Sequence, residues 1–300
     1  MNIAITGGTG LVGQKLTNFL VEQGHSVTIL TRNVSNKQNK ENVNYVEWLN
    51  PNASPVDQLE GIDAVVNLAG ESIMGRWTKL KKERILSSRL EATTELLSII
   101  KHLKKKPKVL VNGSAMGYYG HSDSRQFTEE DRPANTPFLG DVTQKWEKAA
   151  SQATELGIRT VYARIGIVLD ADGGALPKML LPYKLYAGGK VGTGKQWMSW
   201  IHIDDLIRLF SFAIENEQLS GPLNLTAPHP VRMQQLNRTI AKVMGRPHWI
   251  PAPSFAIKTA LGQMSTLILD GAYIFPRKAI QHGFEFRYDD PEKALQQLLN

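Results

Sequence analysis

Glycines with a regular spacing stand directly after the first apolar run of the chain. In "ITGGTGLVG", Gly7, Gly10 and Gly13 are spaced GxxGxxG, and Gly8, Gly10 and Gly13 are spaced GxGxxG. Glycine allows a tight turn here and lets the backbone approach a pyrophosphate at the N-terminus of the next helix. A glycine triplet alone is weak evidence, but a strand pattern precedes this one and a helical pattern follows it. We therefore predict a dinucleotide-binding turn in preference to a turn without ligand, with contacts from Gly7, Thr9, Gly10, Leu11, Val12 and Gly13.

The end of the second strand pattern discriminates between dinucleotides. Proteins that bind NAD usually place Asp or Glu there to hold the ribose 2′-hydroxyl. This chain has Thr31, Arg32 and Asn33 at that place and no acidic residue. The guanidinium fork of Arg32 matches the oxygens of a 2′-phosphate, so NADPH is the predicted cofactor. The alternative is a surface arginine at the start of a loop.

Hydroxyl groups follow a later apolar strand. In "VLVNGSAMGYYG", the strand leads into Ser114, and Tyr118 and Tyr119 come shortly after it. Ligands of doubly wound sheets bind at the carboxyl ends of the strands, where these hydroxyls would lie. The alternative is that the serine and glycines only turn the chain while the tyrosines pack.

Two further motifs do not predict a site. "GKVGTGK", ending at Lys195, has the body of a triphosphate-binding loop, but Gln196 replaces the magnesium-binding Ser or Thr, and an extended pattern follows where a helix is required. "HIDD", His202 to Asp205, stands before a helical pattern, where an aspartate is expected to cap the helix. With no second cluster of ligands nearby and no cysteine in the chain, no metal site is predicted.

Strand and helix patterns alternate through the first half of the chain. Near-continuous apolar strands separated by helices predict a parallel sheet covered on both faces, which is the doubly wound α/β (Rossmann) architecture. Strands are expected at 2–6, 26–32, 43–48, within 61–70, at 108–115 and at 159–169. Helices are expected at 10–24, 81–103 and 144–157, with an amphipathic helix starting in "FLGDVTQKWEKAA", Phe138 to Ala150.

The second half predicts a smaller lobe. Glycines and prolines interrupt the pattern after about residue 170, and 199–227 then gives a strand, a helix and a strand that could rejoin the sheet. We predict an NADP-binding domain at 1–170, joined by about 199–227. A smaller, mostly helical substrate lobe is predicted at 171–198 and 228–300.

Composition narrows the choice of partners. The chain has 300 residues, 42% of them hydrophobic, and a formal net charge of +7. Much of the charge lies in Lys101 to Lys108, where cations complement a helix C-terminus, and no aromatic residue is interleaved for base stacking. We expect no nucleic-acid partner, although attraction to phosphorylated small molecules remains. Since no apolar run reaches roughly 18 residues and a strand begins near Met1, we expect no membrane association and a cytoplasmic location.

Together these motifs resemble the extended short-chain dehydrogenase/reductase superfamily and, more narrowly, the YfhF/YfcH-type epimerase family proteins. The resemblance spans nearly the whole chain, and its tail, about 250–298, is similar to the small C-terminal module of that family. The motifs are specific for the family but not for a substrate. They are "ITGGTGLVG", "LTR", "NLAGESI", "RWT", "SR", "GSAMGYYG", "WE", "ARIGIVL", "GGAL", "GTGKQWMSWIHIDDL", "LNLTAP", "FPRKAIQHGFEF" and "DDPEKALQQLL".

The resemblance implies roles for several residues. In the superfamily a Ser or Thr and a Tyr hold the reacting oxygen, and a Lys four residues after the Tyr binds the nicotinamide ribose. Ser114 matches the serine and Lys145 the lysine, but Asp141 occupies the tyrosine position. An ordinary carboxylate is ionised at neutral pH and could not donate the proton. Either Tyr119, or less readily Tyr118, replaces the acid, or catalysis is lost and nucleotide binding is kept.

The predicted function is an NADP-dependent oxidoreductase of epimerase type. It would move a hydride between nicotinamide and an alcohol or carbonyl carbon of a small polar substrate, a nucleotide-sugar-like one included. The alternative is a catalytically degenerate NADPH-binding regulatory or sensor protein. Both a monomer and a homodimer stay open. Further cofactor contacts are expected from Leu68, Ala69, Gly70 and Glu71, and substrate contacts from Glu71, Arg76, Arg89 and Gln196. Arg76 and Arg89 could instead only tie the long helix to the second lobe.

Overall fold

A seven-stranded parallel sheet forms the centre of the molecule. The computed structural model describes residues 1–133 and 138–299. The strand order is β11-β7-β5-β4-β1-β2-β3, so the chain moves outward from β1 to β3 and then returns to build the other half. The strands are β1 (Asn2–Thr6), β2 (Ser26–Thr31), β3 (Val43–Glu47), β4 (Ala64–Asn67), β5 (Val109–Ala115), β7 (Arg159–Ile165) and β11 (Gly221–Leu225). This confirms the predicted fold class.

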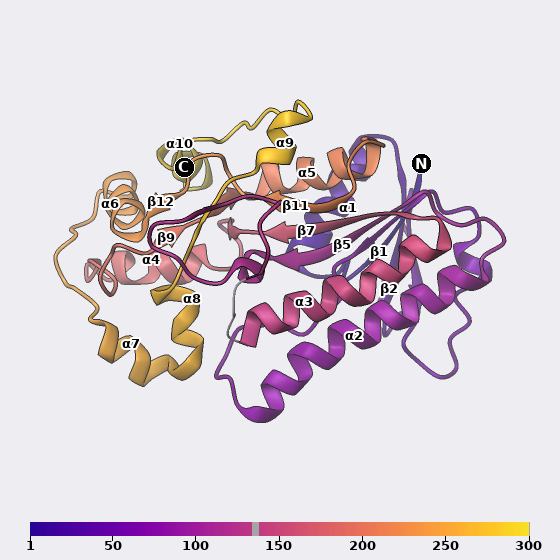
Figure 1. Cartoon of the computed structure of the whole chain (residues 1–300), viewed down its shortest axis with the longest axis horizontal. Helices are drawn as coiled ribbons and strands as arrows, with labels where there is room; N and C mark the ends of the chain where they lie inside the picture. Colours follow the sequence, from indigo (N-terminus) through magenta and orange to yellow (C-terminus); the bar gives the residue numbers. More distant parts are fainter. Residues whose placement is uncertain (134–137, 300) are drawn as a thin grey trace.

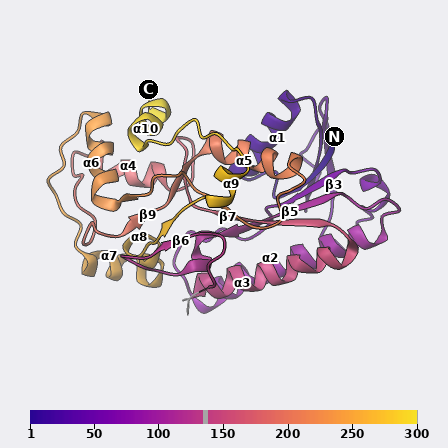
Figure 2. The same ribbon diagram turned by 45° about the horizontal axis from the view of Figure 1, so that its top comes forward.

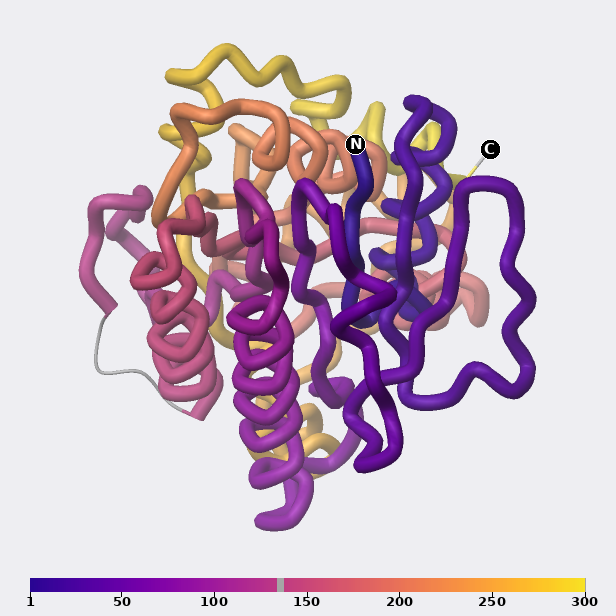
Figure 3. Tube along the Cα trace, turned by 90° about the vertical axis from the view of Figure 1, so that its right-hand side faces the viewer, coloured from indigo at the N-terminus to yellow at the C-terminus, as the bar shows by residue number. Residues whose placement is uncertain are grey.

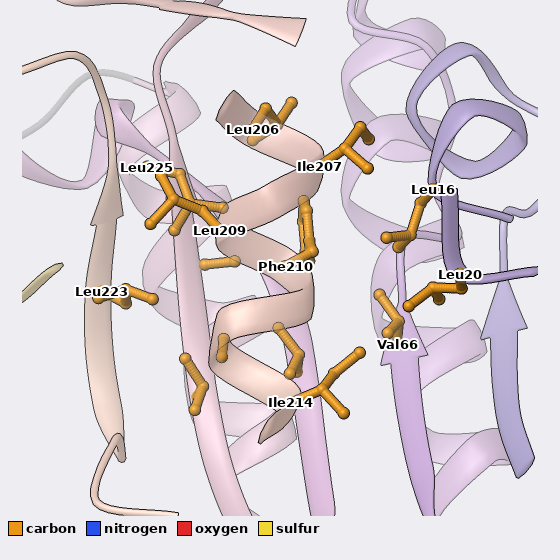
Figure 4. Packing of buried hydrophobic residues seen from close by; sticks show 14 of the residues in the cluster. Leu16, Leu20, Val66, Leu206, Ile207, Leu209, Phe210, Ile214, Leu223 and Leu225 are labelled. Carbon is orange, nitrogen blue, oxygen red and sulfur yellow. The ribbon is translucent and has the colours of Figure 1, made fainter. Parts of the chain in front are cut away.

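Helices cover both faces of this sheet because its strands are apolar on both sides. Along β1, Ile3 and Ile5 face one core cluster and Ala4 faces another, as the two-residue period of a strand requires. Helices α1 and α5 cover the first face, and α2 and α3 lie side by side on the second (Figures 1, 2 and 3). Figure 4 shows Leu16 and Leu20 of α1 and Phe210 of α5 in the first cluster. These helices are α1 (Leu11–Glu22), α2 (Lys79–His102), α3 (Phe138–Ser151) and α5 (Ile203–Glu215).

A smaller group of helices lies beyond the carboxyl ends of β5 and β7 (Figure 1). Its helices are α4 (Leu176–Lys184), α6 (Met233–Met244), α7 (Ser254–Leu261), α8 (Thr266–Leu269) and α10 (Pro291–Leu299). Helix α9 (Arg277–Gln281) instead packs beside β11, and its Ala279 joins the core of the sheet domain. Three pairs of short strands accompany them: β8 (Ile167–Leu169) with β10 (Trp200–His202), β9 (Trp197–Met198) with β12 (Val231–Arg232), and β6 (Gln126–Phe127) with β13 (Tyr273–Ile274). The 3-10 segments are η1 (Asp57–Leu59), η2 (Met116–Tyr119), η3 (Gln152–Leu156) and η4 (Gly262–Ser265).

The prediction of a single strand at 159–169 is wrong, and the break in it marks where the chain leaves the sheet for the smaller group. The apolar run 159–169 was expected as one strand, but it divides at Gly166 into β7, inside the sheet, and β8, outside it. A Cβ at Gly166 would lie 2.6 Å from the carbonyl oxygen of Ser199, so only glycine permits this close crossing. The amide of Ile167 then donates to that carbonyl at 2.8 Å. Strand β10 therefore pairs with β8 instead of rejoining the sheet, whereas β11 does rejoin it beside β7.

The segment from α7 to α8 packs on the edge of the sheet domain. Met264 lies in a buried cluster with Trp77, Ile85 and Val142, which come from the β4–α2 loop, α2 and α3. Partly buried Leu139, at the start of α3, joins the same cluster. Apolar burial of this kind attaches the segment to the β4–α2 loop and to the first turns of α2 and α3.

Candidate cofactor and active site

The glycine turn between β1 and α1 has no space for side chains at three of its positions. Gly7 has a φ of 69°, and a Cβ there would meet the backbone carbonyl carbon of Leu68 at 2.7 Å. A Cβ on Gly13 would lie 2.4 Å from the Gly7 carbonyl oxygen, and one on Gly8 would meet Ile29 at 2.8 Å. These contacts hold the turn tightly against β2 and the β4 loop, as the sequence pattern requires.

The fourth glycine of the turn leaves the N-terminus of α1 open. Gly10 is the N-cap residue and supplies no side-chain hydrogen bond to the helix. The first amides of a helix, here those of Leu11 and Val12, have no acceptor within the helix. A Cβ on Gly10 would approach only the Gly7 carbonyl oxygen, at 3.4 Å. Free amides and the positive end of the helix dipole fit a pyrophosphate.

The β4 loop that faces this turn is fixed by buried polar groups. The hydroxyl of Thr6 donates to Asn67 at 2.6 Å and accepts from the amides of Leu68 and Ala69 at 3.1 Å. Gly70 follows, with its Cα next to the side chain of Arg89. The predicted cofactor contacts at 68–70 thus stand on a rigid strand end opposite the glycine turn.

Basic side chains surround Glu71 near the end of β2. Lys81 binds the Glu71 carboxylate at 2.6 Å and, with further contributions from Arg84 and Arg32, lowers its pKa. Arg32 is exposed directly after β2, and Thr31 ends the strand. The adjacent Asn33 is also exposed, and its side chain caps the turn at Ser35 at 2.7 Å. The charge balance at this edge therefore favours an anion.

Arg89 is a desolvated cation whose hydrogen-bonding acceptors are backbone carbonyls. Its Nη1 donates to the carbonyl oxygens of Glu71 at 3.0 Å and Ile85 at 2.8 Å, and its guanidinium lies 5.1 Å from the ring centre of Trp146. Burial lowers the pKa of Arg89 to about 10. No carboxylate lies within 4.0 Å of Arg89 in the part of the chain that the structure describes. Arg76, by contrast, is exposed in the loop before α2.

Ser114 lies at the end of β5, where it was expected, but its hydroxyl points into a buried ionic network. It donates to Glu147 of α3 at 2.7 Å. Arg164 of β7 binds both oxygens of the same carboxylate at 2.8 Å. A bidentate pair of this kind fixes both partners, so Ser114 shares a rigid acceptor.

Tyr119 belongs to the same network. It is fully buried; its hydroxyl accepts from Arg164 at 2.8 Å and donates to Asn224 of β11 at 2.7 Å. Burial raises the pKa of Tyr119 well above its usual value, against the opposing effect of Arg164. Its proton is therefore held firmly within the protein.

Tyr118 has the more accessible hydroxyl of the two tyrosines. It is half-buried, and the guanidinium of Arg164 stacks 3.3 Å from the centre of its ring. Its hydroxyl has no hydrogen-bond partner among residues 1–133 and 138–299. The ring is thus fixed while the oxygen stays available.

Lys145 and Asp141 do not face this network. They form an exposed i,i+4 ion pair at 2.8 Å, with side chains that are about half exposed. The buried face of α3 instead carries Thr143, Trp146 and Glu147. The structure therefore brings Ser114 and the tyrosines together but separates them from Lys145.

Two other predicted residues have structural partners. Gln196 is buried, and its amide donates to the carbonyl oxygens of Val191 and Ile268, so it holds the 191–196 loop to α8. The predicted aspartate cap of α5 is wrong: His202 is the N-cap and accepts from the amide of Asp204 at 3.1 Å. Asp205 instead accepts from the backbone amides of Arg287 and Tyr288, within the C-terminal module, at 3.1 and 2.8 Å.

Glu147 and Arg164 were missed as members of the site by reasoning from the sequence. A signal was present, because an arginine within the apolar run "ARIGIVL" is unusual in a buried strand unless it is paired. Its partner could not be found from spacing, since it lies on a different element of the chain.

Two segments of the chain match models of known protein families. Residues 3–225 match the model of the NAD dependent epimerase/dehydratase family. The chain belongs to this family. Residues 252–298 match a domain of unknown function (DUF1731). These matches confirm the resemblance drawn from the sequence and support a nicotinamide cofactor for this family member.

Individual relatives cover the whole chain. The epimerase family protein YfhF of Bacillus subtilis is 50% identical over 100% of this chain and 98% of its own length. The human epimerase family protein SDR39U1 (isoform 2), solved with NADPH, is 31% identical with a TM-score of 0.87 and covers 99% of both chains. UDP-glucuronic acid 4-epimerase from Bacillus cereus has the same fold, with 16% identity, a TM-score of 0.79 and coverage of 99% of this chain and 98% of its own.

The described part of the chain holds neither a cluster of metal ligands nor a helix that could span a membrane. Within it, no group of three or more His, Cys, Asp or Glu side chains is arranged to hold a metal ion. None of its helices is both long and apolar enough to cross a bilayer.

Proposed function

We propose that this family member binds NADPH across the carboxyl edge of the sheet and exchanges a hydride with a small polar substrate. The observation that carries the preference for NADPH is Arg32, which stands directly after β2 where NAD-binding proteins usually have an acid. The open N-terminus of α1 supports a pyrophosphate beside it. The human relative that was solved with NADPH supports the same choice.

The residues of the proposed site have separate roles. Bound NADPH supplies the hydride chemistry, and the protein supplies binding and orientation. The amides of Leu11 and Val12 bind the pyrophosphate, and Arg32 binds the 2′-phosphate. Arg89, which has no carboxylate within 4.0 Å in the described part of the chain, orients an anionic group of the cofactor or substrate.

Tyr118 is the proposed acid/base in preference to Tyr119. The hydroxyl of Tyr119 already has two buried partners, whereas that of Tyr118 can accept a partner from the substrate. Ser114 already donates its proton to Glu147 and could only accept from a substrate hydroxyl, so a supporting role in the network suits it better. Lys145 is left out because it lies on the exposed face of α3. Gln196 is left out because its amide binds the backbone carbonyls of Val191 and Ile268. Glu71 and Arg76 are assigned no chemical step.

Replacing Arg32 by Glu tests the cofactor assignment. A charge-assisted bond to phosphate contributes about 1.5 to 3 kcal/mol, so Arg32→Glu should weaken NADPH binding by about 100-fold. NADH has no 2′-phosphate, and its affinity should change by less than about threefold. Lys40→Glu is the matched control, since it makes the same charge change at an exposed site in the following loop. Titration of both cofactors into the three proteins gives the dissociation constants. Equal affinity of the unmodified protein for NADPH and NADH would refute the assignment.

A second candidate is a catalytically degenerate NADPH-binding sensor or regulatory protein. It is favoured by the engagement of Ser114 and Tyr119 in a buried network and by the exposed ion pair at Asp141. Oxidation of NADPH in the presence of a panel of aldehydes and keto-sugars separates the two candidates. Turnover that is lost in Tyr118→Phe, with NADPH binding retained, supports the enzyme. NADPH binding without turnover on any member of the panel supports the sensor.

A further inference from the structure

A basic cavity lies in the smaller lobe, away from the glycine turn. Its volume is about 740 Å³, within the range of small-molecule sites. It lies between α6, the turn before β9 and the loop that follows η2. The residues around it are Asp123, Gly194, Lys195, Arg232, Gln234, Gln235, Arg238, Thr239 and Lys242. None of them belongs to the proposed NADPH site.

Positive charge dominates the wall of this cavity. Among the described residues that line it, Asp123 is the one acidic residue, against four cations. Lys242 is paired with Glu292 at 2.7 Å, and Arg232 is 4.0 Å from the carboxylate of Asp123. Within the described ranges, neither Lys195 nor Arg238 has a carboxylate within 4.0 Å. Two cations from different elements are therefore left to attract an anion into one concave surface.

Arg232 is held in place before any ligand binds. Its guanidinium stacks 3.6 Å from the ring centre of Trp197 and donates to the carbonyl oxygens of Asp123, at 2.9 Å, and Lys195. The indole nitrogen of Trp197 donates to the same Asp123 carbonyl at 3.0 Å. The acceptors of these hydrogen bonds are neutral carbonyl oxygens, and the one carboxylate beside the guanidinium in the described structure is that of Asp123, at 4.0 Å. A fixed cation loses less entropy on binding an anion than a freely rotating one.

We propose that this cavity binds a small molecule that carries two or more phosphate groups. Lys195 and Arg238 supply the unpaired charge, and Arg232 adds a guanidinium that is already held in place. The neutral donors Gln234, Gln235 and Thr239 line the same cavity and can bind the remaining polar groups. A single-stranded nucleic acid fits less well, because Arg232 covers the ring of Trp197 on which a base would stack. The proposal does not depend on the NADPH site.

Calorimetric titration with inorganic pyrophosphate tests the proposal. The titration uses the full chain saturated with NADPH, so that the glycine turn is occupied, in about 150 mM salt to screen weak surface binding. The site variant is Lys195→Gln with Arg238→Gln. The control variant is Lys101→Gln with Lys104→Gln, which removes the same charge from two exposed residues at the end of α2.

The expected result is that pyrophosphate binds the NADPH-saturated protein and that the site variant raises its Kd about tenfold. The control variant should change Kd by less than about twofold, and NADPH affinity should be the same in all three proteins. Absence of binding, displacement of pyrophosphate by NADPH, or equal losses in both variants would each overturn the proposal. So would sulfate binding as tightly as pyrophosphate, or a short single-stranded oligonucleotide binding more tightly than either.

Discussion

Replacing Tyr119 by Phe separates a structural tyrosine from a catalytic one. The substitution removes a single oxygen atom from a fully buried side chain. That oxygen accepts from Arg164 at 2.8 Å and donates to Asn224 at 2.7 Å. Both partners are themselves buried and would keep an unsatisfied polar group.

The expected cost follows from those two partners. An unsatisfied buried polar group costs about 1 to 3 kcal/mol, and the bond to a charged arginine lies at the upper end, so we expect a loss of about 2 to 4 kcal/mol in the free energy of unfolding. At about 2 °C per kcal/mol for a chain of this size, the melting temperature should fall by about 4 to 8 °C. Tyr118→Phe is the matched control, since its hydroxyl has no partner in the described structure, and it should change stability by less than about 0.5 kcal/mol.

Calorimetric or fluorescence-detected melting of the unliganded proteins, followed by NADPH titration, measures both effects. NADPH affinity should be unchanged in both variants when it is measured well below the lower melting temperature. Equal melting temperatures for the two variants would refute the reasoning. Loss of turnover in Tyr119→Phe without loss of stability would return Tyr119 to the acid/base role.

Two further predictions concern residues outside the network. Lys145→Ala breaks an exposed i,i+4 pair, so stability should fall by only about 0.3 to 0.5 kcal/mol and the Kd for NADPH should change less than about twofold; a large loss of NADPH affinity in a titration would show that Lys145 holds the ribose after all. Burial lowers the pKa of His202 below that of the unfolded chain, so the unfolded state binds the extra proton first and stability should fall as the pH drops through about 6.5. Melting temperatures are measured between about pH 7.5 and about pH 5.5. The melting temperature should fall more steeply with decreasing pH for the natural protein than for His202→Gln, and the same dependence on pH in both would contradict this.

Local sequence determined the fold and one end of the proposed cofactor site. Near-continuous apolar runs that alternate with helical patterns predicted the strands and helices of the sheet domain. Such runs are expected because the strands of a parallel sheet are buried on both faces. The spacing of Gly7, Gly10 and Gly13 predicted a turn whose close contacts the structure reproduces. These features could be read without the fold because each depends on residues a few positions apart.

The active-site hydroxyls depended on contacts that no local pattern encodes. Ser114 and Tyr119 lie at and just after the carboxyl end of β5, as the sequence predicts. The partners of their hydroxyls, however, are Glu147 and Arg164, which the sequence did not indicate. The separations along the chain between these partners are 33 and 45 residues. A buried guanidinium must be hydrogen-bonded to offset the cost of its desolvation, and only the packing of the chain decides which acceptors surround it.

Tertiary structure also decided which side of a helix or loop each polar residue occupies. The i,i+4 spacing of Asp141 and Lys145 predicted that they share a face of α3, and they do, but the packing of α3 on the sheet makes that face the exposed one. Gln196 was expected to face a substrate and instead binds the backbone at Ile268, 72 residues away. The basic cavity is assembled from segments around residues 123, 195 and 235, so its charge is spread over the sequence and concentrated only when the chain folds. Periodicity fixes which residues lie together on an element, whereas long-range packing fixes what that set of residues meets.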